Sequence, residues 1–314
     1  MIEKLLFSAR HSNANSIHAL TNKTYLPIKL AGTGTAADVW YCAKTTDIAQ
    51  KHPLPSIPAN LPTDFTAFPT IYAVKIPRRG KHYTLSTEIS TLTRIATALD
   101  TSPLSKISPL RQNVPALHAR GTRQEDGDFR WLTTSAVIGP CLGNFIPRIN
   151  CGPKIPLPRT LVLSIALQLS QVISFLHGLE PPIVHNDVFE LNVMLDTENL
   201  TAQGFPTVVL IDFGTALEGN KAERKAAWER LCFFKLIGKL IRVTAGPGTG
   251  VGEDAEENVE MWEDFIVFVE SVKVMDDARS FEEFWRRFGA WIEEVLEGIA
   301  WEERKTVGCL VRYG

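Results

Sequence analysis

The sequence has few of the features that mark several common classes of protein. It holds five cysteines in 314 residues, at positions 42, 141, 151, 232 and 309. Because their number is odd and no two are spaced C-x-x-C, a disulfide framework and a zinc site are disfavoured and a reducing compartment is favoured. The first 16 residues lack the apolar core of a secretory signal. We therefore expect an intracellular protein, cytoplasmic or nuclear.

Long apolar runs are also missing. The longest one, 161–176, is interrupted by five polar residues. A membrane span needs about 20 predominantly apolar residues, so we expect a buried helix here and no membrane partner. No internal repeat is visible in the sequence.

Net charge is nearly absent, at −2, so nucleic acid is not an expected partner. The total hides an imbalance, because residues 250–314 carry 17 acidic and 7 basic side chains while residues 1–249 carry 18 acidic and 26 basic ones. A basic body favours an anionic ligand such as a phosphate compound. The alternative is that the acidic segment folds back and neutralises the body. A protein partner at the acidic C-terminal helices is a further hypothesis.

Hydrophobic periodicity predicts an α+β protein. The predicted strands are a hairpin within 26–41, then 70–76, 114–120, 129–138, 192–195 and 207–211. The predicted helices are 83–99, 159–178, 221–243, 257–275 and one that begins with a capping box at Ser280 and Glu283. A stretch rich in glycine and proline, 139–158, suggests a boundary between residues 1–138 and 139–314. The proline-rich residues 44–70 are predicted to be a surface insertion.

Two carboxylates follow apolar, strand-like runs. Asp187 lies in IVHNDVFELNVML (183–195), and Asp212 lies in VVLIDFGTA (208–216). Phosphoryl transfer needs such groups, because Mg²⁺ takes one or two oxygen ligands from the protein and a separate Asp orients the attacking hydroxyl.

These segments resemble the protein-kinase-like superfamily, whose catalytic loop reads H-R-D-L-x-x-x-x-N and is followed by D-F-G. The matching residues are His185-Asn186-Asp187, Asn192 and Asp212-Phe213-Gly214. The resemblance implies that Asp187 is the catalytic base and that Asn192 and Asp212 bind Mg²⁺.

The N-terminal half is similar to the same family. Residues 32–39 (GTGTAADV) match its glycine-rich loop, G-x-G-x-x-G-x-V, with Ala37 in place of the third glycine. Residues 72–75 (YAVK) match the V-A-I-K strand, and Glu88 is spaced to pair with its lysine. The resemblance implies that Lys75 is catalytic and that ATP is bound by Gly32, Thr33, Gly34, Val39, Ala73, Lys75 and Glu88.

The resemblance implies a bilobal kinase-like fold, in which an N-lobe of antiparallel sheet plus one helix precedes a mainly helical C-lobe. It implies an enzyme that moves the γ-phosphoryl group of ATP, with Mg²⁺, to a protein serine or threonine. Three alternatives stay open: a kinase of small-molecule alcohols, a nucleotide-binding pseudokinase that acts as an interaction module, and a purely structural two-lobed protein.

The sequence departs from the family at three places. Asn186 stands where many protein kinases have Arg, and Phe189 stands where Ser/Thr kinases carry a phosphate-contacting Lys. No A-P-E signature follows Gly214, and a helix is predicted to begin within about ten residues of it. The loop that shapes a peptide groove is therefore expected to be short or missing.

Overall fold

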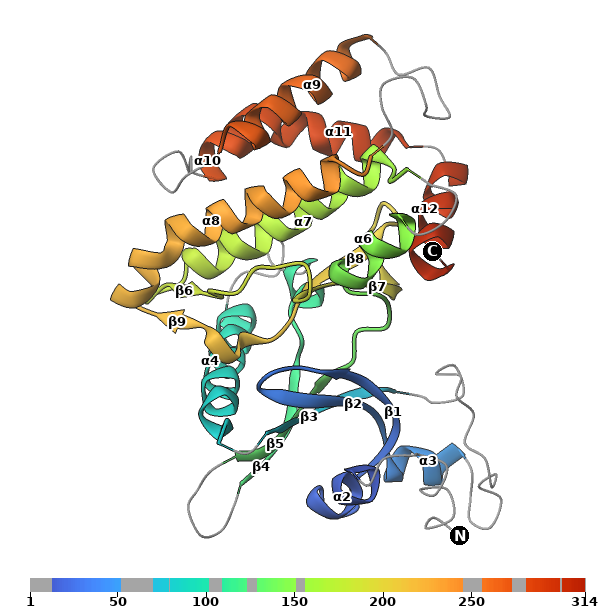
Figure 1. The fold of residues 1–314 in the computed structure, drawn as a ribbon, viewed down its shortest axis with the longest axis vertical. Helices are drawn as coiled ribbons and strands as arrows, with labels where there is room; N and C mark the ends of the chain where they lie inside the picture. The colour runs from blue at the N-terminus through green and yellow to red at the C-terminus, as the bar shows by residue number, and fades with distance from the viewer. Residues whose placement is uncertain are drawn as a thin grey trace. The chain divides into compact units, whose positions relative to one another are not determined.

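A computed structural model gives the fold (Figure 1). It describes residues 13–51, 70–78, 80–101, 109–122, 129–150, 156–244, 256–272, 281–299 and 301–313. The chain is a mixed α+β protein with an antiparallel sheet, which confirms the predicted class.

Contacts divide the chain into two compact units. Unit 1 holds residues 1–96 and 115–136, and unit 2 holds residues 97–114 and 137–314. The chain passes from unit 1 to unit 2 for the second time between residues 136 and 137, close to the boundary predicted from sequence. Residues 97–114 belong to unit 2, whereas that boundary would assign them to the N-terminal part.

Unit 1 is built on a five-stranded antiparallel sheet in the order β1-β2-β3-β5-β4. Its strands are β1 (Tyr25–Thr33), β2 (Ala37–Lys44), β3 (Tyr72–Pro77), β4 (Leu117–Thr122) and β5 (Phe129–Ser135). The predicted hairpin is β1 and β2, whose turn is closed by a 2.9 Å hydrogen bond from the Gly34 N–H to the Ala37 carbonyl.

The two faces of this sheet have different covers. On one face a buried aromatic and aliphatic cluster includes Tyr25, Trp40, Tyr72 and Val74, and it packs against Ile17 of α2 (Asn13–Leu20). On the other face Leu132 packs against Leu85 and Ile89 of α4 (His82–Thr101). Alternation along a strand sends neighbouring side chains to opposite faces, so Lys75 lies on the α4 face and Val74 on the α2 face.

Unit 2 is mainly helical. In Figure 1, α7 (Arg159–His177) and α8 (Asn220–Ile241) run side by side, and α9 (Glu256–Ser271) packs on α8. The chain then forms α10 (Phe281–Phe284), a π-helical turn η5 (Trp285–Gly289) and α11 (Ala290–Gly298). Aromatic rings join these helices in one core, namely Phe233, Phe234, Phe265, Phe268, Phe281, Phe284 and Phe288.

Two small β elements carry the polar residues of interest in unit 2. The hairpin β7 (Val193–Leu200) and β8 (Pro206–Leu210) is antiparallel, with Val193 opposite Leu210. The two-residue strands β6 (Ile183–Val184) and β9 (Leu217–Glu218) pair with each other. Asp187 and Asn192 thus lie between β6 and β7, and Asp212 lies between β8 and β9.

Helix α7 is the candidate for a membrane span by length and composition among the described residues, and 72% of its apolar window is buried inside the structure. Its buried positions lie almost all round the helix. This burial agrees with the expectation of a core helix.

Some elements differ from the sequence predictions. Residues 45–51 form a helix, α3, with Ile48 buried, so the start of the predicted insertion is folded. Residues 52–69 and Ser280, the predicted N-cap, lie outside the described residues. Helices α2, α6 (Leu142–Asn150) and α12 (Trp301–Tyr313) were not predicted. In α6 the fully buried Leu142 and Phe145 hold a helix together within a glycine- and proline-rich stretch.

Candidate active site

Lys75 and Glu88 form a buried ion pair in unit 1. The Lys75 Nζ lies 2.6 Å from the Glu88 Oε2, and their side chains are only 9% and 6% exposed. The strand β3 and the helix α4 bring them together across thirteen residues of sequence. A buried charge needs a close partner because its desolvation is costly, so each residue requires the other. The pairing that the resemblance implied is present.

Gly32, Val39 and Ala73 share a face of the sheet with Lys75. Strand register places Gly32 opposite Val39, Val39 opposite Lys75, and Lys75 opposite Leu132. Ala73 lies two residues before Lys75, so its side chain points to the same face. Four candidates therefore lie on one face across three strands, namely Gly32, Val39, Ala73 and Lys75. Thr33, which pairs with Asp38, lies on the opposite face.

The glycines of the turn are not required by the protein's own packing. A Cβ at Gly32 would meet no atom within 4 Å, and a Cβ at Gly34 would meet only the Ala37 carbonyl at 3.5 Å. Neither residue has a positive φ. Residues 31–35 are exposed. Open space above two glycines and an exposed Thr33 fits a ligand that approaches the backbone closely, as a phosphate does.

In unit 2 a hydrogen-bonded loop holds Asp187 and Asn192 together. The Asn192 side-chain nitrogen donates to the Asp187 Oδ2 at 2.7 Å and to the Asp187 carbonyl at 2.9 Å. Both side chains are half-buried. The loop thereby fixes the direction of the Asp187 carboxylate and leaves part of it open to solvent.

Asp212 lies next to this loop. The Ile211 N–H donates to the Asn192 carbonyl at 2.9 Å, and the His185 Nε2 donates to the Ile211 carbonyl at 2.9 Å. Asp212 itself is left-handed, with φ 66°, and its Oδ1 accepts a 3.4 Å bond from the Gly214 N–H. Asp is among the residues that tolerate this conformation, which is frequent at functional sites.

His185 and Phe213 form the buried floor under these groups. Their rings meet edge to face at a centroid distance of 4.7 Å, and both residues are fully buried. Since a carbonyl can only accept, the His185 Nε2 carries the proton. The His185 Nδ1 has no hydrogen-bond partner within the described parts of the chain.

Glu229 of α8 holds the Asp187 loop by a hydrogen bond to its backbone. This residue is 1% exposed, and its carboxylate accepts a 2.6 Å bond from the Asn186 N–H and a 3.0 Å bond from the His177 Nε2. Asn186 has a positive φ of 64°, a conformation that asparagine adopts more readily than most residues. Its side-chain nitrogen also donates to the Thr215 carbonyl at 3.3 Å. Asn186 thus serves a structural role in the loop.

A buried polar network supports β8 and was missed by sequence reasoning. The Asn113 side chain donates to the Val208 carbonyl at 2.7 Å and to the Gln168 Oε1 at 3.1 Å, and Gln168 accepts from the Val208 N–H at 2.9 Å. These residues lie up to 95 positions apart in sequence. No local pattern signals such a network, because its partners are brought together only by the fold.

The donors available in unit 2 suit a hard cation. Asp187, Asn192 and Asp212 offer carboxylate and amide oxygens, which are the ligands that Mg²⁺ prefers. The described residues contain no group of three or more His, Cys, Asp and Glu side chains that would hold a metal alone. This is compatible with Mg²⁺, because Mg²⁺ takes only one or two protein ligands and completes its shell with phosphate and water.

The neighbouring thiol is not a nucleophile. Burial and the nearby charge of Glu229 raise the pKa of the Cys232 thiol to about 11, and the charge of Asp187 adds to the effect. A thiol with this pKa is protonated at neutral pH and unreactive.

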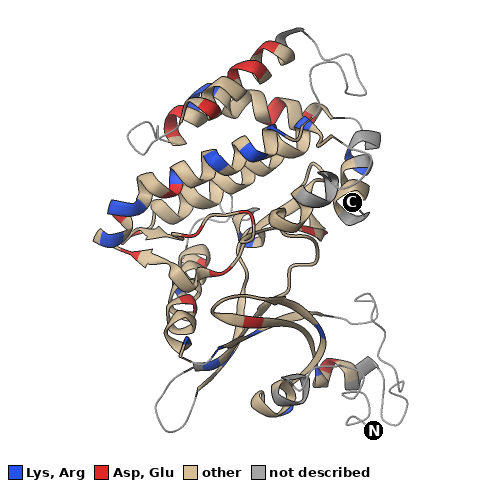
Figure 2. Ribbon diagram, in the orientation of Figure 1, with Lys and Arg blue, Asp and Glu red and all other residues tan. Residues whose placement is uncertain are grey.

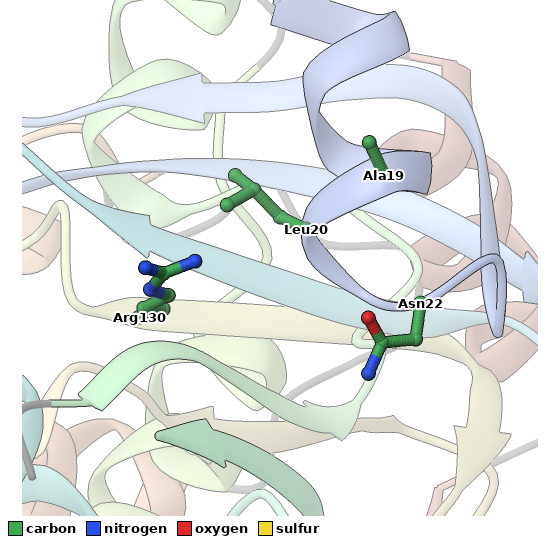
Figure 3. Close-up of a pocket in the computed structure, with 4 residues that line it drawn as sticks. All are labelled: Ala19, Leu20, Asn22 and Arg130. Carbon is green, nitrogen blue, oxygen red and sulfur yellow. The ribbon is translucent and has the colours of Figure 1, made fainter. Parts of the chain in front are cut away.

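A hollow lies elsewhere in unit 1. It has a volume of about 580 Å³ and is lined by Ala19, Leu20, Asn22 and Arg130, which Figure 3 shows at the end of α2 and on β5. None of the predicted site residues lines it. A single cation and one amide do not converge on a ligand, so this hollow carries no candidate site.

The structure brings the predicted residues together in two sets. On one face of its sheet unit 1 joins Gly32, Val39, Ala73 and Lys75, with Glu88 on the helix that covers this face. Thr33 pairs with Asp38 and lies on the opposite face, and Gly34 lies in the turn that follows β1. Unit 2 joins Asp187, Asn192 and Asp212 around one loop. Comparison of the chain with protein-family models and with curated proteins found no match.

Proposed function

We propose that the protein is an ATP- and Mg²⁺-dependent phosphotransferase with a bilobal kinase-like fold, and that it moves the γ-phosphoryl group to a serine or threonine of another protein. The observation that carries this proposal is the buried Lys75–Glu88 pair on the same sheet face as Gly32, which begins the open glycine turn. A lysine fixed in this way presents a point charge to a phosphate while its counter-ion keeps it charged.

The residues of unit 2 support the same chemistry. Asp187, held by Asn192, accepts the proton of the acceptor hydroxyl and orients that hydroxyl for attack. Asp212 and the Asn192 side-chain oxygen supply oxygen ligands for Mg²⁺. When bound, Mg²⁺ neutralises charge on the transferring phosphoryl group. Glu229 and His185 keep the loop and the Asp212 turn in register.

Thermal unfolding with and without Mg-ATP tests the nucleotide and metal assignment. Wild type is expected to gain melting temperature in Mg-ATP, because a ligand that binds only the folded state stabilises it. Asp212→Asn is expected to lose most of that gain. Asp264→Asn, an exposed carboxylate of α9, is the matched control and is expected to keep it. An equal gain in Asp212→Asn would contradict the metal assignment.

A second candidate function is a nucleotide-binding module without transfer activity. The observation that favours it is Phe189, a side chain 43% exposed two residues after Asp187, where Ser/Thr kinases carry a lysine. Loss of this cation removes stabilisation of charge in the transition state. Mg-ATP binding together with the absence of any phosphoryl transfer would favour the module.

A further inference from the structure

The exposed side of α8 carries a row of positive charge. Six exposed basic residues belong to this basic row, namely Lys221, Arg224, Lys225, Lys235, Lys239 and the C-cap Arg242. At 3.6 residues per turn all six fall within an arc of about 100°. Of the two acidic residues of α8, Glu223 is on the far side of the helix and Glu229 is buried. Figure 2 shows the blue bands along α8.

The Asp187 loop crosses the middle of the basic row. Cys232 falls within the arc and is buried, and the charge of Asp187 contributes to its raised pKa. Glu229 bonds to Asn186 at 2.6 Å, and Lys239 bonds to Glu190 at 2.9 Å. The loop that carries the proposed catalytic base therefore contacts α8 between residues 229 and 239. Lys221, Arg224 and Lys225 precede this contact region, and Arg242 follows it.

The position of these charges is unfavourable for the helix itself. Lys221, Arg224 and Lys225 occupy the first two turns of α8, where the helix dipole favours acidic side chains. The N-cap, Gly219, makes no side-chain cap hydrogen bond. Neither Lys221 nor Lys225 has an acidic partner within the described residues. These basic residues do not stabilise the helix N-terminus, so we look for their role in the binding of a ligand.

The length of the row points to an extended ligand. From residue 221 to residue 242 the helix rises about 32 Å, at 1.5 Å per residue. An extended peptide covers about 3.3 Å per residue, so about ten residues span this distance. A small anion needs charges that converge on one point, and these charges are spread along a line.

We propose that the acceptor is an acidic protein segment that lies extended along α8, with acidic residues on both sides of the hydroxyl that is phosphorylated. This inference rests on the proposed function, because it places the acceptor hydroxyl at the Asp187 loop. The acidic segment supplies the charge that the basic row lacks, and its centre meets the loop.

The experiment measures binding of a labelled peptide to the full chain in the absence of ATP, by fluorescence anisotropy. The probe is a Glu-rich peptide of about ten residues with one central serine, the length that spans the row. The variant is Lys221→Glu with Lys225→Glu, which places acids at the helix N-terminus and is expected to fold with an unchanged or higher melting temperature. The matched control, Arg286→Glu with Lys305→Glu, changes the net charge equally at exposed sites of other helices.

Wild type and control are expected to bind the acidic peptide alike, and the α8 variant is expected to bind it about tenfold more weakly, with affinity falling as salt rises. Equal affinity in the α8 variant and the control would overturn the proposal. Tighter binding of an RNA oligonucleotide of the same charge than of the peptide would also overturn it. Charge-dependent peptide binding without phosphoryl transfer would support the docking surface and contradict the proposed function.

Discussion

Two lysine–glutamate pairs in this molecule have nearly the same separation and very different surroundings. Lys75 and Glu88 lie 2.6 Å apart with side chains 9% and 6% exposed, whereas Lys239 and Glu190 lie 2.9 Å apart with side chains 46% and 30% exposed. Water screens the second pair and not the first. The comparison teaches that burial, and not distance, decides how much each pair contributes to stability.

The largest expected effect is the loss of one partner of the buried pair. Glu88→Ala leaves the Lys75 ammonium buried without its counter-ion, and we expect the free energy of unfolding to fall by about 3–5 kcal/mol. Urea unfolding measures the change. The double variant Lys75→Met with Glu88→Leu is the control and is expected to lose much less, since it leaves no buried charge. A double variant as unstable as the single one would contradict this account.

The next effect concerns the packing of residue 139 against β7. Gly139 has φ 156°, and a Cβ there would collide with the backbone carbonyl of Leu195 on β7. We expect Gly139→Ala to lower the free energy of unfolding by about 1–3 kcal/mol, because backbone cannot move aside as a side chain can.

Gly308→Ala is the matched control for this change. It lies in α12 with no atom within 4 Å of the added Cβ, and alanine is a better helix former than glycine. Thermal unfolding compares the two variants. If Gly139→Ala is as stable as Gly308→Ala, the close approach to β7 is wrong.

A smaller effect is expected for Gly32→Ala, which distinguishes a role of this glycine in packing from a role in ligand binding. Gly32→Ala adds a Cβ in open space, so we expect the stability of the free protein to be unchanged. If the turn approaches a phosphate, the same Cβ interferes, and Mg-ATP affinity is expected to fall about tenfold, or about 1.4 kcal/mol. Calorimetric titration measures the affinity. Unchanged affinity would remove the glycine turn from the proposed site.

The smallest effect is that of the exposed pair. Burial works against the charged Glu190, but the hydrogen bond and charge of Lys239 outweigh it, so the pKa of the Glu190 carboxyl is lowered. A lowered pKa in the folded state means that the stabilisation is present above the ordinary carboxyl pKa and is lost as the pH falls through the lowered value.

Lys239→Met tests this pair. It is expected to cost about 0.2–1 kcal/mol at pH 7 and nothing at acidic pH, where Glu190 is protonated. Denaturant unfolding of both proteins at the two pH values measures it. A loss as large as that of Glu88→Ala would show that exposure does not separate the two pairs.

Much of the fold followed from periodicity. The predicted helix 83–99 is α4 at His82–Thr101, and the predicted helix 159–178 is α7 at Arg159–His177. Long segments with one regular pattern carry their own signal. The helix α6 gave no such signal, because its segment is rich in glycine and proline. Only the burial of Leu142 and Phe145, which the fold reveals, stabilises this helix. The two-residue strands β6 and β9 are too short to show a period.

The candidate site divides in the same way. The resemblance to the kinase-like pattern implied the pairing of Lys75 with Glu88, and this ion pair is present. The hydrogen bond from Asn192 to Asp187 was not predicted. The roles of Asn113 and Gln168 could not be predicted, since their hydrogen bonds join segments that only the fold brings together. The left-handed backbone of Asn186 explains its residue type only once the conformation is known.

The central claim is that Asp187 activates a hydroxyl for phosphoryl transfer. The most direct test is transfer of radiolabelled phosphate from ATP to an acidic serine-containing peptide, by wild type and by Asp187→Asn. The variant keeps the shape of the side chain and removes the base, so we expect Mg-ATP binding to persist and transfer to fall about 10²–10⁴-fold. Equal transfer by both proteins, or none by wild type while it binds Mg-ATP, would contradict the claim.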